Sequence, residues 1–208
     1  MTRLAALLFL VYCSLGAQTP PGQLIDVGAY RVHVYCTGTG TPTVILIGAF
    51  SFDWALVQPE LAKSTRVCSY DPSGNAFSDP GPVATCEGRV DEIHRLLTSA
   101  HIDPPYVFAE SARNLHRWAM SRNPERPTAA LAEACIAALQ DATPGHLPLV
   151  VVSTANDSPG YANLQTSLLA LSPNSRHMIA DRSFHSIEIS QPAIVIDAIR
   201  QAIEATRK

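Results

Sequence analysis

The sequence predicts an α/β protein built on a doubly wound, mostly parallel β-sheet, and three observations support this fold class. The uninterrupted run of β-branched and leucine residues at 43–47 is typical of a strand buried on both faces of a parallel sheet, and the apolar segment 149–153 predicts another buried strand. Segments with helical spacing of apolar residues alternate with such runs. A length of 208 residues suits one domain and argues against a second full one.

The elements follow from local patterns along the chain. Segments 24–25 and 30–35 predict an antiparallel entry hairpin around Gly28, because apolar and polar residues alternate there. Asp53 is a candidate N-cap for a helix over 54–62. Ile196, Ile199 and Ile203 form one stripe of a C-terminal helix. The remaining predictions are strands at 66–70, 106–109 and 176–180, and helices at 87–99, 112–122, 128–142 and 161–171.

Residues 1–17 have the pattern of a signal peptide. Arg3 precedes an apolar run over 4–15, and small residues follow it. The run is shorter than the ~20 residues of a membrane span, although an uncleaved anchor or a buried first strand would also explain it. We expect cleavage after Ala17, a single domain over 18–208, and a secreted or periplasmic location.

Composition argues against several classes of partner. Removing residues 1–17 takes away Arg3 and no acidic residue, which leaves a net charge of about −4 and no basic cluster for nucleic acid. A second apolar segment of spanning length is absent from the sequence, so we expect no membrane insertion after cleavage. The cysteines lack CxxC or zinc-like spacing, so we expect no metal and no cofactor.

The informative polar residues are those that directly follow the predicted strands. In open α/β sheets, ligands bind beyond the carboxyl ends of the strands. A serine, an acid and a histidine occur there in the chain order that accompanies a nucleophile elbow. In order along the chain, these positions are Gly48-Ala49, Asp71, Glu110-Ser111-Ala112, Asn156-Asp157 and Ser183-Phe184-His185.

With these residues in place, the sequence resembles the α/β-hydrolase superfamily, and within it exported serine hydrolases. The resemblance lies in the segment 51–82 and in C-terminal runs that include 148–157 and 183–201. It implies Ser111 as nucleophile, His185 as general base and Asp157 as the group that orients the histidine. It also implies an oxyanion hole made of the backbone N–H groups of Ala49 and Ala112.

The sequence departs from the superfamily pattern in several places. The elbow pattern GxSxG has Arg113 at its last position, where glycine allows the helix to pass close to the sheet. Ile47 and Pro72 occupy positions where relatives often carry histidine and arginine. Only residues 115–147 lie between the elbow helix and the next strand, so we expect no lid and one strand fewer. The strand before Asp157 could then pair directly with the strand that ends at Ala109.

Several alternatives are open at this point. Ser111 could be only a helix N-cap, and Asp157 could be only a turn residue. We interpret Asp71 as loop structure and not as a catalytic group. The hydrolase strand order makes a disulfide between Cys36 and Cys68 a hypothesis.

The sequence therefore predicts a serine hydrolase that acts on small-molecule ester or related acyl substrates. The alternative is a catalytically inactive, shortened hydrolase-fold protein that serves as a binding module or is a remnant.

Overall fold

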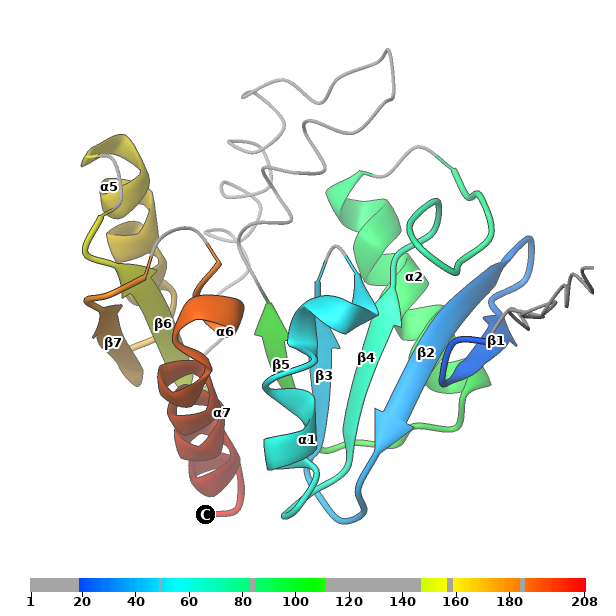
Figure 1. The fold of residues 1–208 in the computed structure, drawn as a ribbon, viewed down its shortest axis with the longest axis horizontal. Helices are drawn as coiled ribbons and strands as arrows, with labels where there is room; N and C mark the ends of the chain where they lie inside the picture. Colours follow the sequence, from blue (N-terminus) through cyan, green and yellow to red (C-terminus); the bar gives the residue numbers. More distant parts are fainter. Residues whose placement is uncertain (1–18, 49, 83–84, 111–146, 157–158, 184–185) are drawn as a thin grey trace, which may run out of the picture.

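The computed structural model describes residues 19–48, 50–82, 85–110, 147–156, 159–183 and 186–208. Within these residues the main sheet has five strands in the order β1-β2-β4-β3-β5 (Figure 1). They are β1 (Gln23–Asp26), β2 (Arg31–Thr37), β3 (Thr43–Ile47), β4 (Val67–Asp71) and β5 (Tyr106–Glu110). The strands β3, β4 and β5 are parallel, whereas β1 and β2 form the predicted antiparallel hairpin at one edge.

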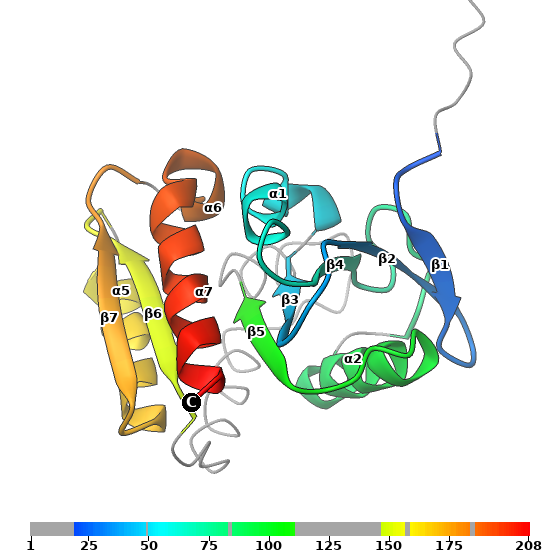
Figure 2. The same cartoon turned by 90° about the horizontal axis from the view of Figure 1, so that it is seen from below.

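Helices cover both faces of this sheet, as the doubly wound prediction requires (Figure 2). The helix α2 (Cys86–Ser99) packs on one face, where Leu96 joins a core with Ile45 and Tyr70. The helices α1 (Gln58–Leu61) and α7 (Pro192–Thr206) pack on the other face. The predicted α/β class is therefore confirmed.

A second, two-stranded parallel sheet consists of β6 (Leu149–Thr154) and β7 (Ser175–Ala180). The stripe of Ile196, Ile199 and Ile203 on α7 packs against the main core, and α7 contacts both β5 and β6. Figure 2 shows α7 between these two strands. The expectation that β6 could pair directly with β5 is wrong for the part of the chain described, because the apolar face of α7 covers this flank of the main sheet.

Short helical elements account for the remaining differences from the predicted boundaries. The expected helix over 54–62 is divided into a 3-10 helix η1 (Ser51–Trp54) and α1, so Asp53 lies inside η1 and is not the N-cap of a longer helix. The physical reason is that its carboxylate already accepts a bond from the N–H of Phe50. The segment after β6 forms α5 (Pro159–Ser167) and η2 (Leu168–Leu171), and α6 (Ile187–Ser190) was not predicted. The predicted helices at 112–122 and 128–142 fall outside the described residues.

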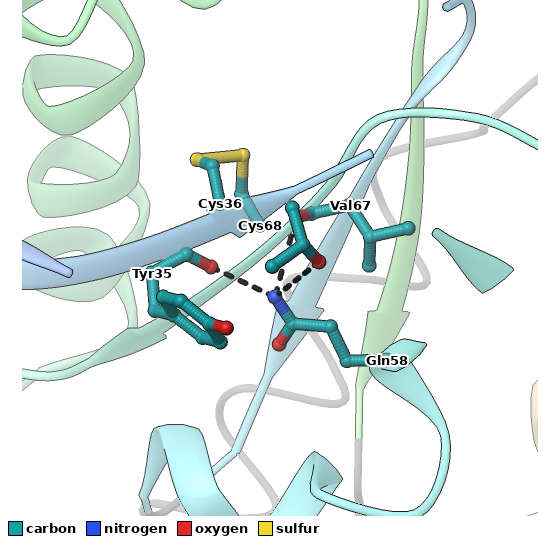
Figure 3. The surroundings of a disulfide bond; sticks show 6 residues. Tyr35, Cys36, Gln58, Val67 and Cys68 are labelled. Carbon is teal, nitrogen blue, oxygen red and sulfur yellow. Dashed lines mark hydrogen bonds between the residues drawn. A yellow bond between two sulfur atoms is a disulfide. The ribbon is translucent and has the colours of Figure 1, made fainter. Parts of the chain in front are cut away.

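A disulfide joins the antiparallel hairpin strand β2 to β4. Cys36 and Cys68 are directly opposite each other in the strand register, and their sulfur atoms are bonded, which confirms the disulfide hypothesis. Beside it, the side chain of Gln58 donates to the carbonyl oxygens of Tyr35 and Val67 at 3.0 and 3.3 Å (Figure 3). The disulfide thus joins β2 to β4, and the buried amide of Gln58 fastens α1 to the same pair of strands.

Candidate active site

The carboxyl ends of the central strands meet at one edge of the main sheet. Ile47 is paired with Tyr70 on one side and with Glu110 on the other. The next residue after Glu110 in the sequence is Ser111, so the predicted nucleophile follows the strand end that lies beside Ile47. Ser111, Ala112 and Ala49 themselves lie outside the described residues.

The turn that follows β3 is fixed by side chains from η1 and β4. The backbone N–H of Phe50 donates to Oδ2 of Asp53 at 3.2 Å, and the N–H of Ser51 donates to Oδ1 of Asp71 at 2.5 Å. The indole ring of Trp54 packs beneath Gly48. This turn contains Ala49, the residue that the hydrolase resemblance assigns to the oxyanion hole.

Asp71 is the last residue of β4 and is fully buried. Its Oδ2 atom lies 2.9 Å from Nδ1 of His33, whose other ring nitrogen lies 3.0 Å from the carbonyl oxygen of Pro21. A buried carboxylate needs such partners to offset its loss of hydration. We interpreted Asp71 as loop structure from the sequence, but it is the last residue of a strand.

The loop after β4 is anchored by a second polar cluster that the sequence did not reveal. Both carboxylate oxygens of the buried Glu92 accept from the N–H of Ser73 at 3.3 Å. Arg89 binds Glu92 at 2.7 Å and Ser73 at 3.2 Å. Burial, followed by the nearby Glu92 carboxylate, raises the pKa of Tyr30. These contacts hold the start of α2 against the loop.

The ends of β6 and β7 are tied together at the second sheet. The side-chain amide of Asn156 donates to the carbonyl oxygen of Ser183 at 2.9 Å, and the hydroxyl of Thr154 donates to the same oxygen. In the sequence, Asp157 directly follows Asn156, and His185 is two residues after Ser183. The described flanks of the predicted acid and base are therefore in contact, whereas Asp157 and His185 themselves lie outside the described residues.

The described residues on both sides of positions 184–185 bond to residues of α6 or to Gln191, which precedes α7. The hydroxyl of Ser183 and the N–H of Arg182 both donate to Oε1 of Gln191, at 2.9 and 2.8 Å. On the other side of residue 185, Ser190 donates to the carbonyl oxygen of Ser186 at 2.7 Å. The helix α6 contacts η1, which follows the Ala49 turn. This contact links the edge of the second sheet to that of the main sheet.

The described residues contain neither a metal-binding cluster nor a membrane-spanning helix. Within the ranges described above, histidine, cysteine and acidic side chains form no group of three or more that could hold a metal ion. Among the helices described, none is long and apolar enough to span a membrane.

Comparison with solved structures identifies the fold. No family model matches the sequence, and no curated protein matches it. Solved structures match in fold, and those that match include hydrolases and an esterase at 14–17% identity. The chain therefore has the α/β-hydrolase fold.

Three solved structures illustrate the similarity. A protein described as a predicted CIB-like hydrolase, from Thermoplasma acidophilum, is 17% identical, with 89% of this chain and 97% of that chain covered and a TM-score of 0.67. A thermophilic esterase from Thermogutta terrifontis is 16% identical, with coverages of 91% and 100% and a TM-score of 0.68. The meta-cleavage product hydrolase CumD from Pseudomonas fluorescens IP01 is 14% identical, with coverages of 88% and 98% and a TM-score of 0.60.

Proposed function

We propose that the protein is a serine hydrolase that cleaves ester or related acyl substrates through Ser111, His185 and Asp157. The observation that carries the proposal is the contact between Asn156 and Ser183, because it joins the chain just before Asp157 to the chain just before His185. In a catalytic triad, the acid must hold one ring nitrogen of the histidine while the other ring nitrogen faces the serine. Because the residues that precede Asp157 and His185 are hydrogen-bonded to each other, they favour a contact between the acid and the histidine.

The reaction follows the general scheme for an activated serine. The Ser111 hydroxyl oxygen bonds to the acyl carbon while His185 takes its proton, and the carbonyl electron pair moves onto the oxygen. The backbone N–H groups of Ala49 and Ala112 would stabilise that oxyanion. The alcohol leaves with the proton from His185, and water then releases the acid from Ser111 by the reverse sequence of transfers.

Hydrolysis of p-nitrophenyl acetate by the purified full chain tests this proposal. We expect Ser111→Ala to abolish the ester rate above background and to prevent labelling by a fluorophosphonate probe. Ser64→Ala is a matched control, since Ser64 is an exposed serine after α1, and it should behave as the wild type. An ester rate that survives in Ser111→Ala would show that the nucleophile assignment is wrong.

A second candidate function is that of an inactive hydrolase-fold binding module. It is favoured by the position of α7 between β5 and β6, because Ser111 follows β5 while Asp157 follows β6. Arg113 in the elbow favours it too. A wild-type protein that unfolds cooperatively, yet neither hydrolyses esters nor reacts with the probe, would support this alternative.

We propose further that the protein is exported, with residues 1–17 removed. The disulfide between Cys36 and Cys68 supports an oxidising compartment, where such bonds persist. Expression of the full chain in a host that secretes proteins, followed by intact-mass measurement, tests this. A product that starts at Gln18 is expected, and a cell-retained product with residue 1 present would contradict export.

A further inference from the structure

The strand β7 is the outer strand of the second sheet. Among the described residues it pairs with β6 alone, and Figure 2 shows it at one end of the described elements, beyond β6. The strand is regular over its whole length, from Ser175 to Ala180. An edge strand of this kind presents a row of backbone N–H and C=O groups that can pair with another strand.

The direction of these backbone groups follows from two hydrogen bonds at the ends of the ladder. The N–H of Leu149 donates to the carbonyl oxygen of Asn174 at 3.2 Å, and the N–H of Ala155 donates to that of Ala180 at 3.4 Å. Because the direction alternates along a strand, the even-numbered residues of β7 face β6. The odd-numbered residues have their N–H and C=O groups on the outer edge, where no described residue bonds to them. They are Ser175, His177 and Ile179.

The side chains of β7 leave the outer edge uncovered because they bond within the same molecule. Nε2 of His177 lies 2.7 Å from the hydroxyl of Ser153 on β6, and Arg176 donates to Gln201 of α7 at 3.2 Å. Neither lysine nor proline occurs in the strand, although these residues commonly prevent edge strands from pairing. Ile179 is 48% exposed and adds apolar surface beside the free backbone groups.

The outer edge of β7 is complementary to itself in an antiparallel pair. A two-fold axis perpendicular to the sheet places odd-numbered residues opposite odd-numbered residues, and these residues have the outward N–H and C=O groups. When His177 is opposite Ile179 of a second copy, the two residues exchange both of their backbone hydrogen bonds. Their exposed side chains then lie next to each other on one face of the sheet.

The charges at the two ends of β7 favour the same antiparallel pairing. In this register Arg176 is opposite Ala180 of the second copy, and the next residue of that copy is Asp181, whose side chain is 74% exposed. Arg182 lies further along, opposite Asn174. A parallel pair would instead place Arg176 beside Arg176, and like charges at such close range oppose pairing.

We propose that β7 is a homodimer interface, in which the β7 strands of two copies pair antiparallel across a two-fold axis. The two-stranded sheets of the two copies become one continuous sheet. A sheet of two strands is marginal by itself, whereas a larger sheet packed against helices is stable. The interface does not depend on the proposed hydrolase function, since it forms equally in an active and in an inactive protein.

Sedimentation velocity of the purified wild type and of two variants at one position tests the interface. We expect a wild-type dimer at a protein concentration on the order of 100 µM that dissociates on dilution. His177→Pro removes an outward N–H and no bond to β6, so it should be monomeric. The matched control His177→Ala keeps this N–H and should remain dimeric. A wild type that stays monomeric up to about 500 µM would overturn the inference.

A second pair of variants keeps the test decisive if His177→Pro does not fold. Ile179→Lys places a positive charge on the outer edge of β7 and should prevent dimerisation. Its matched control is Leu24→Lys, because Leu24 is 41% exposed on β1, the opposite edge strand of the main sheet, and this variant should dimerise as the wild type does. A dimer of wild-type strength in Ile179→Lys would show that another surface forms it.

Amide hydrogen exchange measured by NMR locates the interface in the wild type itself. The N–H groups of His177 and Ile179 should exchange at least about tenfold more slowly at high than at low protein concentration, because only the dimer gives them a partner. The N–H of Met178 faces β6 in both states and serves as the internal control. Exchange at His177 and Ile179 that does not depend on concentration would contradict pairing through β7.

Discussion

The side-chain amide of Asn156 and the backbone carbonyl of Ser183 are joined by a hydrogen bond of 2.9 Å. The bond spans the carboxyl ends of β6 and β7, two parallel strands whose following loops carry the proposed acid and base. Thr154, the last residue of β6, donates to the same carbonyl oxygen, so that oxygen has two donors from the end of β6 and the loop after it. The described starts of the two loops are therefore joined by hydrogen bonds.

Asn156→Ala removes one of these donors. We expect kcat for p-nitrophenyl acetate to fall by about tenfold, because a misdirected Asp157 no longer orients His185, while stability drops by only about 1 kcal/mol. Steady-state kinetics and urea unfolding measure the two effects. The matched control is Asn163→Ala, an exposed residue of α5; equal kcat values for the two variants would contradict the proposed role of the loop.

Replacing both disulfide cysteines, Cys36→Ser with Cys68→Ser, should destabilise the protein by about 2–4 kcal/mol, because the bond closes a loop between residues 32 positions apart. Urea unfolding of the oxidised wild type and of the double variant gives the difference. The reduced wild type is the control and should unfold at nearly the same urea concentration as the double variant. A double variant as stable as the oxidised wild type would contradict this prediction.

Asp79→Asn tests the ion pair at the start of β2. The hydrogen bonds from Arg31 hold the pKa of the Asp79 carboxyl below its ordinary value. A carboxyl with a lowered folded-state pKa contributes stability above its unfolded pKa and loses it as the pH falls through the folded value. The wild type should therefore have the higher Tm at pH 7, and this advantage should shrink below about pH 4.

The matched control for this comparison is Asp103→Asn, an exposed aspartate before β5. It should show no pH-dependent difference of the same sign. A Tm difference between wild type and Asp79→Asn that grows as the pH falls would have the wrong sign for the ion pair.

Ile199→Ala tests the packing of α7 on the main sheet. Ile199 is buried among the core side chains that include Val44 and Val107, so we expect a loss of about 2–5 kcal/mol in the free energy of unfolding. Ile189→Ala is the matched control, because Ile189 on α6 is 49% exposed and should cost under about 1 kcal/mol. Similar losses for the two variants would show that α7 contributes little to the core.

The strands of the main sheet could be predicted from the sequence because their patterns are local. The run 43–47 has β-branched or leucine side chains on both faces, and the strand β3 has the same bounds. The predicted helix over 54–62 was less accurate. The N–H of Phe50 donates to the side chain of Asp53, and this local hydrogen bond competes with a regular helix. Composition alone does not show which of the two conformations is the more stable.

The candidate site could be predicted only in part, since its contacts join distant segments. Chain order and strand ends were enough to suggest Ser111, Asp157 and His185, which stay predictions. The pairing of His33 with Asp71 spans 38 positions and depends on the antiparallel register of β2 and β4. The place of α7 between β5 and β6 was missed, because an apolar helical stripe shows that a face is buried and not which strand it covers.

The position of α7 also affects the order in which the chain can mature. Val44, Leu46 and Val107 belong to strands that are made early, but part of their apolar cover comes from residues 192–206. During synthesis from the N-terminus, the central strands therefore have a partly uncovered apolar surface until that segment is available. A chaperone that shields this face of β3 and β5 would thus be useful only until α7 docks.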